Sequence, residues 1–274
     1  MTAAGPGRRM LDGATPRAAA VASTGDALLR LERISRHFGQ LKAVHEVSFK
    51  MAAGELRAVI GPNGAGKTTF FNLISGLHPP TSGHVWFAGK DITHSRVVER
   101  VRQGIVRTFQ ITEILPELNV VENIRLAVET AAGANSKPWI SRAQRTALDC
   151  RVEELIEIVD LRGKEDRVVG ELAHGDQRVV EVAMALSLRP RLLLLDEPTA
   201  GMGEAESEHM VGLMKRLHAD QGLSILFIEH DMDIVFGLAQ RITVLDQGRT
   251  LAEGKPDEIA ADPKVRAAYL GEAE

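Results

Sequence analysis

The chain has 274 residues, of which 44% are hydrophobic and 26% are charged, with a formal net charge of −4 at pH 7. This length allows one large domain or two small ones, and the apolar fraction permits a sizeable core. The mildly negative charge argues against a nucleic-acid-binding surface. A single cysteine, Cys150, excludes a disulfide framework or a thiolate metal cluster. The apolar runs are far shorter than the ~20 residues that a membrane-spanning helix needs.

The first part of the chain predicts an unstructured arm followed by short strands. Residues 1–27 are rich in Ala, Gly, Pro and Arg, which is typical of a disordered segment. Alternating patterns and short apolar runs then predict strands. The expected strands are Leu28–Ile34, Val44–Met51, Leu56–Ile60, Val85–Ala88 and Ile105–Phe109, with a helix over Phe70–Ser75.

The pattern becomes helical and more charged in the middle of the chain and then alternates again. The expected helices of the middle block are Asn119–Glu129, Ser141–Val159 and Asp176–Leu188. After it we expect strands over Arg191–Leu195 and Ser224–Ile228, helices over Glu204–His218 and Met232–Ala239, and a hairpin of Ile242–Leu245 with Arg249–Ala252. This alternation predicts an α/β fold whose mostly parallel sheet is built from both ends of the sequence, with a helical block inserted.

A glycine-rich loop between a predicted strand and a predicted helix matches the pattern G-x-x-x-x-G-K-[ST] at every fixed position. Glycines let the backbone turn tightly and present N–H groups to phosphate oxygens. Lys67 can reach the β- and γ-phosphates, and the Thr68 hydroxyl can bind Mg²⁺. The sequence therefore predicts an ATP site formed by Gly61, Pro62, Asn63, Gly64, Ala65, Gly66, Lys67, Thr68 and Thr69.

A second acidic element lies more than a hundred residues downstream. The buried strand Leu192–Leu195 ends in Asp196 and Glu197. If it lies parallel and next to the strand of the loop, Asp196 is placed beside Mg²⁺ at the carboxyl edge. Glu197 can orient or deprotonate an attacking water. Gln110 and His230 each end another strand, where their side chains can face a γ-phosphate or its water.

These residues in this order resemble the nucleotide-binding subunit of ATP-binding cassette (ABC) transporters, over residues 28–272. The resemblance implies a P-loop NTPase fold with a mixed sheet core and an inserted α-helical subdomain, and it implies ATP and Mg²⁺ as cofactors. It identifies the Walker A loop as residues 61–68, the Walker B strand as Leu192–Asp196, the catalytic glutamate as Glu197, the Q-loop glutamine as Gln110 and the switch histidine as His230. It places Thr68, Gln110 and Asp196 around Mg²⁺ and Phe38 against the adenine.

Two motifs depart from the usual pattern of the family. The signature Leu-Ser-Gly-Gly-Gln reads Leu-Ala-His-Gly-Asp at 172–176, and the D-loop reads Ala-Gly-Met-Gly at 200–203. Gly175 and the N-terminus of the helix after it are still expected to face, in trans, the phosphate of the ATP bound to a second subunit. The same departures, and the sequence Ala-Tyr-Leu-Gly-Glu at 268–272, resemble those of the ATPases of branched-chain amino acid importers. ATPases that serve urea or short amides, or lipopolysaccharide export, share much of this pattern.

The resemblance also implies an organisation and partners. It divides the chain into an ATPase core (28–110 and 190–255), a helical subdomain (111–189) and a C-terminal helical extension (256–272). The expected partners are integral membrane permease subunits, a second ATP-binding subunit that is identical or paralogous, and, indirectly, a periplasmic substrate-binding protein, but no nucleic acid. The expected location is the cytoplasmic face of the inner (plasma) membrane, as a peripheral subunit.

Three other functions are compatible with a phosphate loop. An ABC ATPase of translation or DNA repair typically has two cassettes or long insertions, and this chain has neither. A regulatory nucleotide binder without catalysis is favoured only by the altered signature. A small-molecule kinase leaves the second acid, Glu197, and the inserted helical block unexplained.

Overall fold

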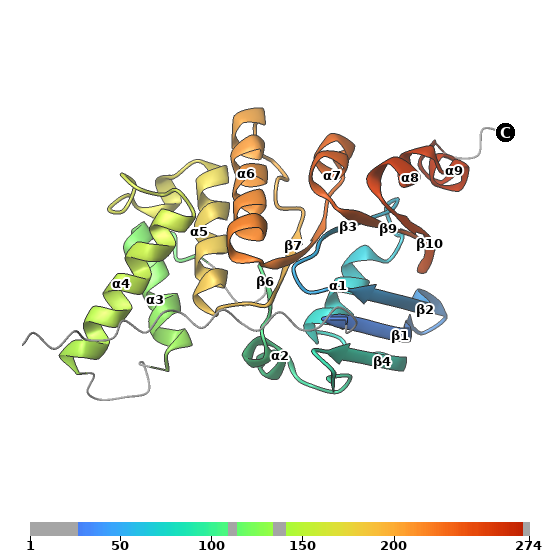
Figure 1. Ribbon diagram of the computed structural model, residues 1–274, viewed down its shortest axis with the longest axis horizontal. Helices are drawn as coiled ribbons and strands as arrows, with labels where there is room; N and C mark the ends of the chain where they lie inside the picture. Colours follow the sequence, from blue (N-terminus) through green and yellow to red (C-terminus); the bar gives the residue numbers. More distant parts are fainter. Residues whose placement is uncertain (1–26, 109–113, 134–140, 271–274) are drawn as a thin grey trace, which may run out of the picture.

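Two β-sheets organise the part of the chain that the computed structural model describes, which is residues 27–108, 114–133 and 141–270 (Figure 1). A six-stranded sheet has the order β10-β9-β3-β8-β7-β6, and a four-stranded sheet has the order β2-β1-β4-β5. The strands are β1 (Leu29–Phe38), β2 (Leu41–Met51), β3 (Leu56–Ile60), β4 (Ser82–Phe87), β5 (Lys90–Asp91), β6 (Ile105–Arg107), β7 (Leu192–Asp196), β8 (Ser224–Ile228), β9 (Arg241–Asp246) and β10 (Arg249–Gly254).

The six-stranded sheet is parallel except for β10, which forms an antiparallel hairpin with β9. Its strands β3 and β6 precede the helical block, and β7 to β10 follow it. The apolar runs of β3 and β8 are buried along their whole length, as expected for strands covered on both faces. The prediction of a mostly parallel sheet built from both ends of the sequence is confirmed.

The four-stranded sheet corrects that prediction in one respect. The first strands do not join the parallel sheet but pair antiparallel with one another, β1 between β2 and β4. Their period-2 pattern shows that one face is buried, but it does not say which strands are neighbours. The buried side chains of β1 and β2, including Leu29, Leu31, Phe49 and Met51, pack into a core shared with one face of the parallel sheet.

The described ranges contain nine α-helices. They are α1 (Lys67–Ser75), α2 (Val97–Gln103), α3 (Val120–Ala131), α4 (Arg142–Ile158), α5 (His174–Ser187), α6 (Glu204–Gln221), α7 (Met232–Leu238), α8 (Pro256–Ala261) and α9 (Pro263–Leu270). The sequence did not predict α2 or the two-residue strand β5. Arg100 of α2 is only 1% exposed and donates to backbone carbonyls of Leu73, Ile74, Ile92 and Thr93. This tertiary contact holds α2 in place.

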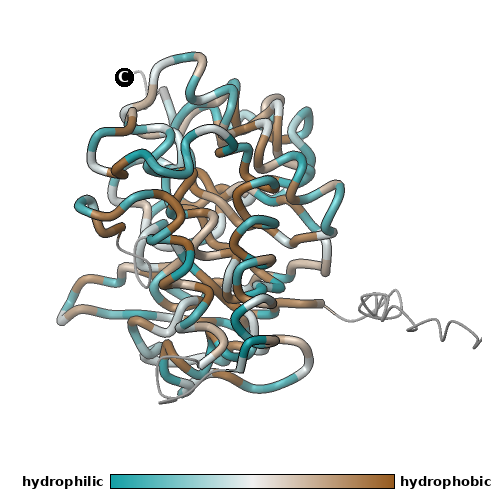
Figure 2. Tube along the Cα trace, turned by 90° about the vertical axis from the view of Figure 1, so that its left-hand side faces the viewer, coloured by the Kyte–Doolittle hydropathy of each residue, from teal (hydrophilic) through white to brown (hydrophobic). Residues whose placement is uncertain are grey.

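The helices and sheets form two hydrophobic cores. Helix α1 lies between the two sheets, with Phe70, Phe71, Leu73 and Ile74 in the core that they share. The opposite face of the parallel sheet packs on the helices of the second half, and α3, α4 and α5 stand together at the left of Figure 1. Along the chain, hydrophobic segments gather in the middle of the molecule (Figure 2). No helix in the described ranges is both long and apolar enough to cross a bilayer.

Candidate functional site

The predicted phosphate loop joins β3 to α1, and the packing of its neighbours fixes its shape. A Cβ atom on Gly61 would lie 2.1 Å from the Leu245 carbonyl oxygen of β9, and one on Gly66 would lie 2.2 Å from the Ala43 carbonyl oxygen of β2. Gly66 also has a φ of 98°. No other residue fits these two positions, because neighbouring backbone occupies the space of a side chain. The loop is thus held between strands of both sheets at the start of α1.

Lys67, the first residue of α1, is 7% exposed. Its Nζ donates to the carbonyl oxygens of Gly61 at 2.7 Å and Pro62 at 3.1 Å. Burial lowers the pKa of Lys67, whereas the nearby charges of Glu197 and Asp196 act in the opposite direction. The fold therefore brings the ammonium group close to the two predicted acids. Thr68 is exposed and Thr69 is half-buried at the start of the same helix.

Asp196 ends β7, which lies parallel to β3 but is separated from it by β8, so the expectation that the two strands are neighbours is wrong. Its carboxylate is held by an arginine to which the sequence analysis gave no role in the site. Arg107 Nη2 donates to Asp196 Oδ2 at 2.5 Å, and Arg107 Nη1 donates to Asn72 Oδ1 at 2.6 Å. Arg107 belongs to β6, which is paired in parallel with β7. A basic residue inside a short buried strand was the available signal, because a buried guanidinium group needs anionic or carbonyl partners.

Glu197 and His230 lie together, because they follow β7 and β8, which are neighbours in the sheet. Asp196 pairs with Ile228 in the register of β7 and β8, and the Glu197 N–H donates to the Ile228 carbonyl oxygen at 3.0 Å. His230 Nε2 lies 2.8 Å from Glu197 Oε1. Glu197 has a φ of 49°, which is a strained conformation for a residue with a side chain. Strain of this kind is often found at functional sites, although six other non-glycine residues in the described ranges also have a positive φ.

Two other predicted residues contribute less to this picture. Gln110 lies outside the described residues. Phe38 is 42% exposed at the end of β1, and its ring contacts His78 at a centroid distance of 5.6 Å. The Arg36 guanidinium group lies 4.7 Å from the centre of the same ring. The role of Phe38 in stacking on adenine stays a prediction.

The altered signature lies at the start of α5, which begins at His174 and not at Asp176 as predicted. Gly175 is therefore in the first turn of the helix. Its N–H donates to Glu206 Oε1 of α6 at 3.0 Å, and the other oxygen of Glu206 accepts from Gly203 N–H at 3.1 Å. Ala173 at the N-cap provides no side-chain acceptor. Glu206 replaces that cap from a distant part of the sequence, and it links the signature to the D-loop.

Replacing Glu206 by alanine is expected to lower the melting temperature by about 2–4 °C at pH 7, because two N–H groups lose their acceptor. Hydrogen bonds from Gly203 and Gly175 lower the pKa of Glu206, so its contribution is present at neutral pH. It is lost as the pH falls and the carboxylate is protonated. Differential scanning calorimetry at pH 7 and at acid pH measures both effects. Glu208→Ala, on the exposed side of the same helix, is the control; equal melting temperatures of the two variants would contradict the link.

The residues described here fit Mg²⁺ in their chemistry. Mg²⁺ prefers oxygen ligands and is commonly held by one or two protein groups together with substrate phosphates. Thr68 and Asp196 offer a hydroxyl and a carboxylate of this kind. No group of three or more His, Cys, Asp or Glu in the described ranges has the arrangement of a self-sufficient metal site. Any Mg²⁺ here would depend on groups beyond these two, such as phosphates and water, for the rest of its ligands.

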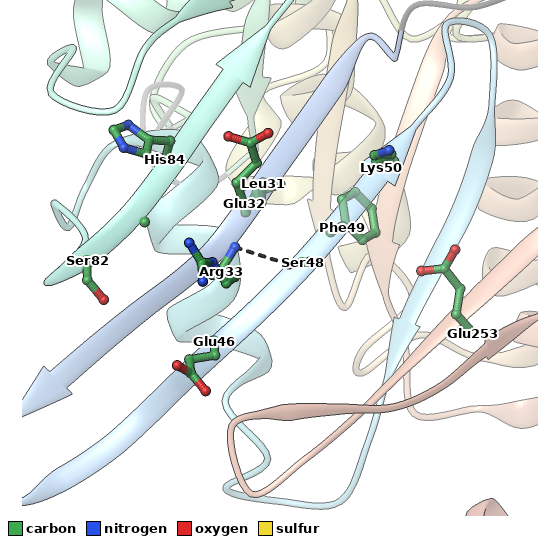
Figure 3. A pocket seen from close by; sticks show the side chains of 11 residues that line it. Leu31, Glu32, Arg33, Glu46, Ser48, Phe49, Lys50, Ser82, His84 and Glu253 are labelled. Atoms are coloured by element: carbon green, nitrogen blue, oxygen red, sulfur yellow. Dashed lines mark hydrogen bonds between the residues drawn. The ribbon is translucent and has the colours of Figure 1, made fainter.

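A surface pocket of about 810 Å³ lies away from these residues (Figure 3). Strands β1, β2 and β4 and Glu253 of β10 line it, and the Arg33 N–H donates to Ser48 Oγ at 3.1 Å across its floor. Both acidic and basic side chains line it, including Glu32, Arg33 and Glu46 (Figure 3). None of the predicted nucleotide-site residues lines this pocket, so we place the candidate site at the loop and not here.

Comparison with protein families decides the class. The pattern of the ABC transporter family matches residues 44–200, which span the phosphate loop, Asp196 and Glu197. The chain belongs to the ABC transporter family. A second family, described as branched-chain amino acid ATP-binding cassette transporter, matches residues 249–274. The predicted class of ABC-type ATPase with a mixed sheet is confirmed.

Curated relatives resemble the chain over nearly its whole length. The high-affinity branched-chain amino acid transport ATP-binding protein BraF of Pseudomonas aeruginosa is 37% identical over 90% of this chain and 98% of its own. The protein LivG of Escherichia coli (strain K12), which carries the same description, is 38% identical with the same coverage. The probable LivG of Methanocaldococcus jannaschii is 34% identical over 89% of this chain and 98% of its own.

Solved ABC cassettes have the same fold. A nucleotide-free ATP-binding cassette from an ABC transporter superimposes with a TM-score of 0.77 at 32% identity, covering 90% of this chain and all of the other. The ADP conformation of an ATP-binding cassette of an ABC transporter gives a TM-score of 0.77 at 33% identity, with the same coverage. The predicted similarity to the ATPases of branched-chain amino acid transporters is thus confirmed at the level of the family.

Proposed function

We propose that this ABC ATPase binds Mg²⁺-ATP and uses its hydrolysis to drive import of branched-chain amino acids through membrane permease subunits. The observation that carries the substrate class is the match of residues 249–274 to the branched-chain family. This segment lies outside the phosphate loop and the Walker B strand, which are the motifs that ABC ATPases share. The descriptions of BraF and LivG support the same substrate.

Binding of the nucleotide is assigned to the loop and the start of α1. The N–H groups of residues 61–69 and the positive end of the helix would face the phosphates. Lys67 would exchange its carbonyl partners in the loop for the β- and γ-phosphates. When bound, Mg²⁺ would offset the charge of the phosphates, held on the protein side by Thr68 and Asp196, with Gln110 as a further predicted ligand. Phe38 is the proposed platform for the adenine.

Hydrolysis is assigned to the pair of Glu197 and His230. Glu197 Oε1 lies within hydrogen-bond distance of His230 Nε2, so the imidazole can fix the orientation of the carboxylate. A carboxylate in this position can accept a proton from a water that attacks the γ-phosphate. Most of the catalysis comes from positioning and charge stabilisation.

A second ATP-binding subunit, identical or paralogous, is part of the proposal. Gly175 contacts Glu206 of its own chain. It lies on α5, whereas the phosphate loop leads into α1. In a head-to-tail pair it would face the nucleotide of the partner. The parts would then divide their roles, with 28–110 and 190–255 as the ATPase core, 111–189 as the subdomain that meets the permeases, and 256–272 as an extension. The pair would bind at the cytoplasmic face of the membrane, with a periplasmic binding protein acting indirectly.

The proposal is tested by reconstituting the full chain with the permease subunits that purify with it from detergent-solubilised membranes. We expect hydrolysis of ATP enclosed in the proteoliposomes to rise several-fold when a binding protein loaded with leucine is added outside them. Lys67→Ala in the same complex is the control for contaminating ATPases. Stimulation by urea or by lipopolysaccharide, and none by leucine, would assign the chain to one of the related systems instead.

A further inference from the structure

Two proposed Mg²⁺ ligands come from different elements, and one buried arginine joins those elements. Arg107 is 5% exposed and lies on β6. One end of its guanidinium group donates to Asp196 Oδ2 at the end of β7, at 2.5 Å. The other end donates to Asn72 Oδ1 on α1, at 2.6 Å. The group therefore spans the gap between the strand that carries the acid and the helix that follows the phosphate loop.

The position of Asn72 connects this bridge with the phosphate loop. Thr68 and Asn72 are four residues apart on α1, so their side chains lie on the same face of the helix. Because the guanidinium group of Arg107 binds Asn72 and Asp196, it constrains the distance between Asp196 and the face of α1 that carries Thr68. The Phe71 ring, 5.6 Å from the guanidinium carbon, packs on the group from the same helix. Arg107 thus links the helix that carries the hydroxyl to the strand that carries the carboxylate.

The charge and shape of arginine suit this task in a way that lysine does not. A planar fork with several N–H donors can bind two acceptors at once in fixed directions, whereas an ammonium group acts as a single point. Arg107 binds Oδ2 of Asp196, and the carboxylate has a second oxygen that can bind a cation. The pair is also costly to break, because the guanidinium group of Arg107 is buried and would be left without its ionic partner.

The geometry points to Arg107 as a positioning residue that sets the distance between Thr68 and Asp196 and thereby the strength of Mg²⁺-dependent nucleotide binding. This inference rests on the proposed function, since it needs ATP at the loop. Arg107 does not touch the nucleotide in this role. It acts through Asn72 on one side and Asp196 on the other.

The test compares ATP affinity with Mg²⁺ and with EDTA, by isothermal titration calorimetry on the full-length chain. Arg107→Lys is expected to reduce the gain in affinity on adding Mg²⁺ by about tenfold, with the affinity in EDTA unchanged within about twofold. Asn72→Ala, which removes only one end of the bridge, should reduce the same gain by a smaller factor. If Arg107→Lys does not fold, Asn72→Ala still tests the inference.

A second buried arginine provides the matched control. Arg100 also anchors α1, through the carbonyl oxygens of Leu73 and Ile74 near the end of that helix, and it is 1% exposed. Arg100→Lys should lower the melting temperature but leave the gain from Mg²⁺ as in the wild type. If Arg107→Lys behaves in the same way, Arg107 is only structural and the inference is wrong. If the wild type binds no ATP in either buffer, the proposed function itself fails.

Discussion

Replacing Lys67 by alanine is expected to reduce the affinity for Mg²⁺-ATP by at least about 100-fold. Hydrogen bonds to a charged group contribute about 1.5–3 kcal/mol each, so losing two of them to the phosphates costs two decades or more in affinity. The ammonium group is already at the loop, where it donates to the carbonyl oxygens of Gly61 and Pro62. Binding would redirect these bonds without moving the helix.

The measurement is a titration with a fluorescent ATP analogue, together with a melting curve for each variant. Lys90→Ala is the control, because Lys90 is exposed on β5 and belongs to no predicted site. Its affinity should equal that of the wild type. Affinity of Lys67→Ala within threefold of the wild type would refute the assignment of the loop.

Motifs whose residues are close in sequence could be predicted with correct positions. The loop at 61–68 requires a strand before it and a helix after it, and β3 and α1 are found there. The acids at the end of β7 and His230 just beyond β8 were expected near each other because parallel strands end at the same edge of a sheet. The structure brings Asp196 and Glu197 close to Lys67, and His230 close to Glu197. Their catalytic roles remain proposals.

Contacts between distant segments could not be predicted, and they explain the differences. Glu206 satisfies the Gly175 N–H from 31 residues away, so α5 starts earlier than its own sequence indicates. Arg107 reads as one residue of a short apolar strand until β7 and α1 are placed on either side of it. The separate antiparallel sheet has the same cause, because alternation identifies a buried face but not the neighbouring strand.

Replacing Glu197 by glutamine is expected to lower the rate of ATP hydrolysis by about 10²–10⁴-fold while ATP affinity stays close to that of the wild type. Glutamine has the shape of glutamate and can still contact His230, but it cannot accept the proton of an attacking water. With binding intact and hydrolysis blocked, ATP-bound subunits should accumulate as a closed pair. Size-exclusion chromatography with Mg²⁺-ATP and single-turnover hydrolysis measure the two effects.

Asp231→Asn is the matched control for an acid-to-amide change next to the same site. Asp231 caps α7 by accepting from the N–H groups of Asp233 and Ile234, and asparagine is an equally good cap. This variant should hydrolyse ATP at the wild-type rate and form no stable pair. If Glu197→Gln also keeps the wild-type rate, Glu197 is not the base. The strained φ of 49° would then have to serve another purpose, such as holding Ala200 and the D-loop against Glu197 through the Ala200 N–H, which donates to its carbonyl oxygen at 3.1 Å.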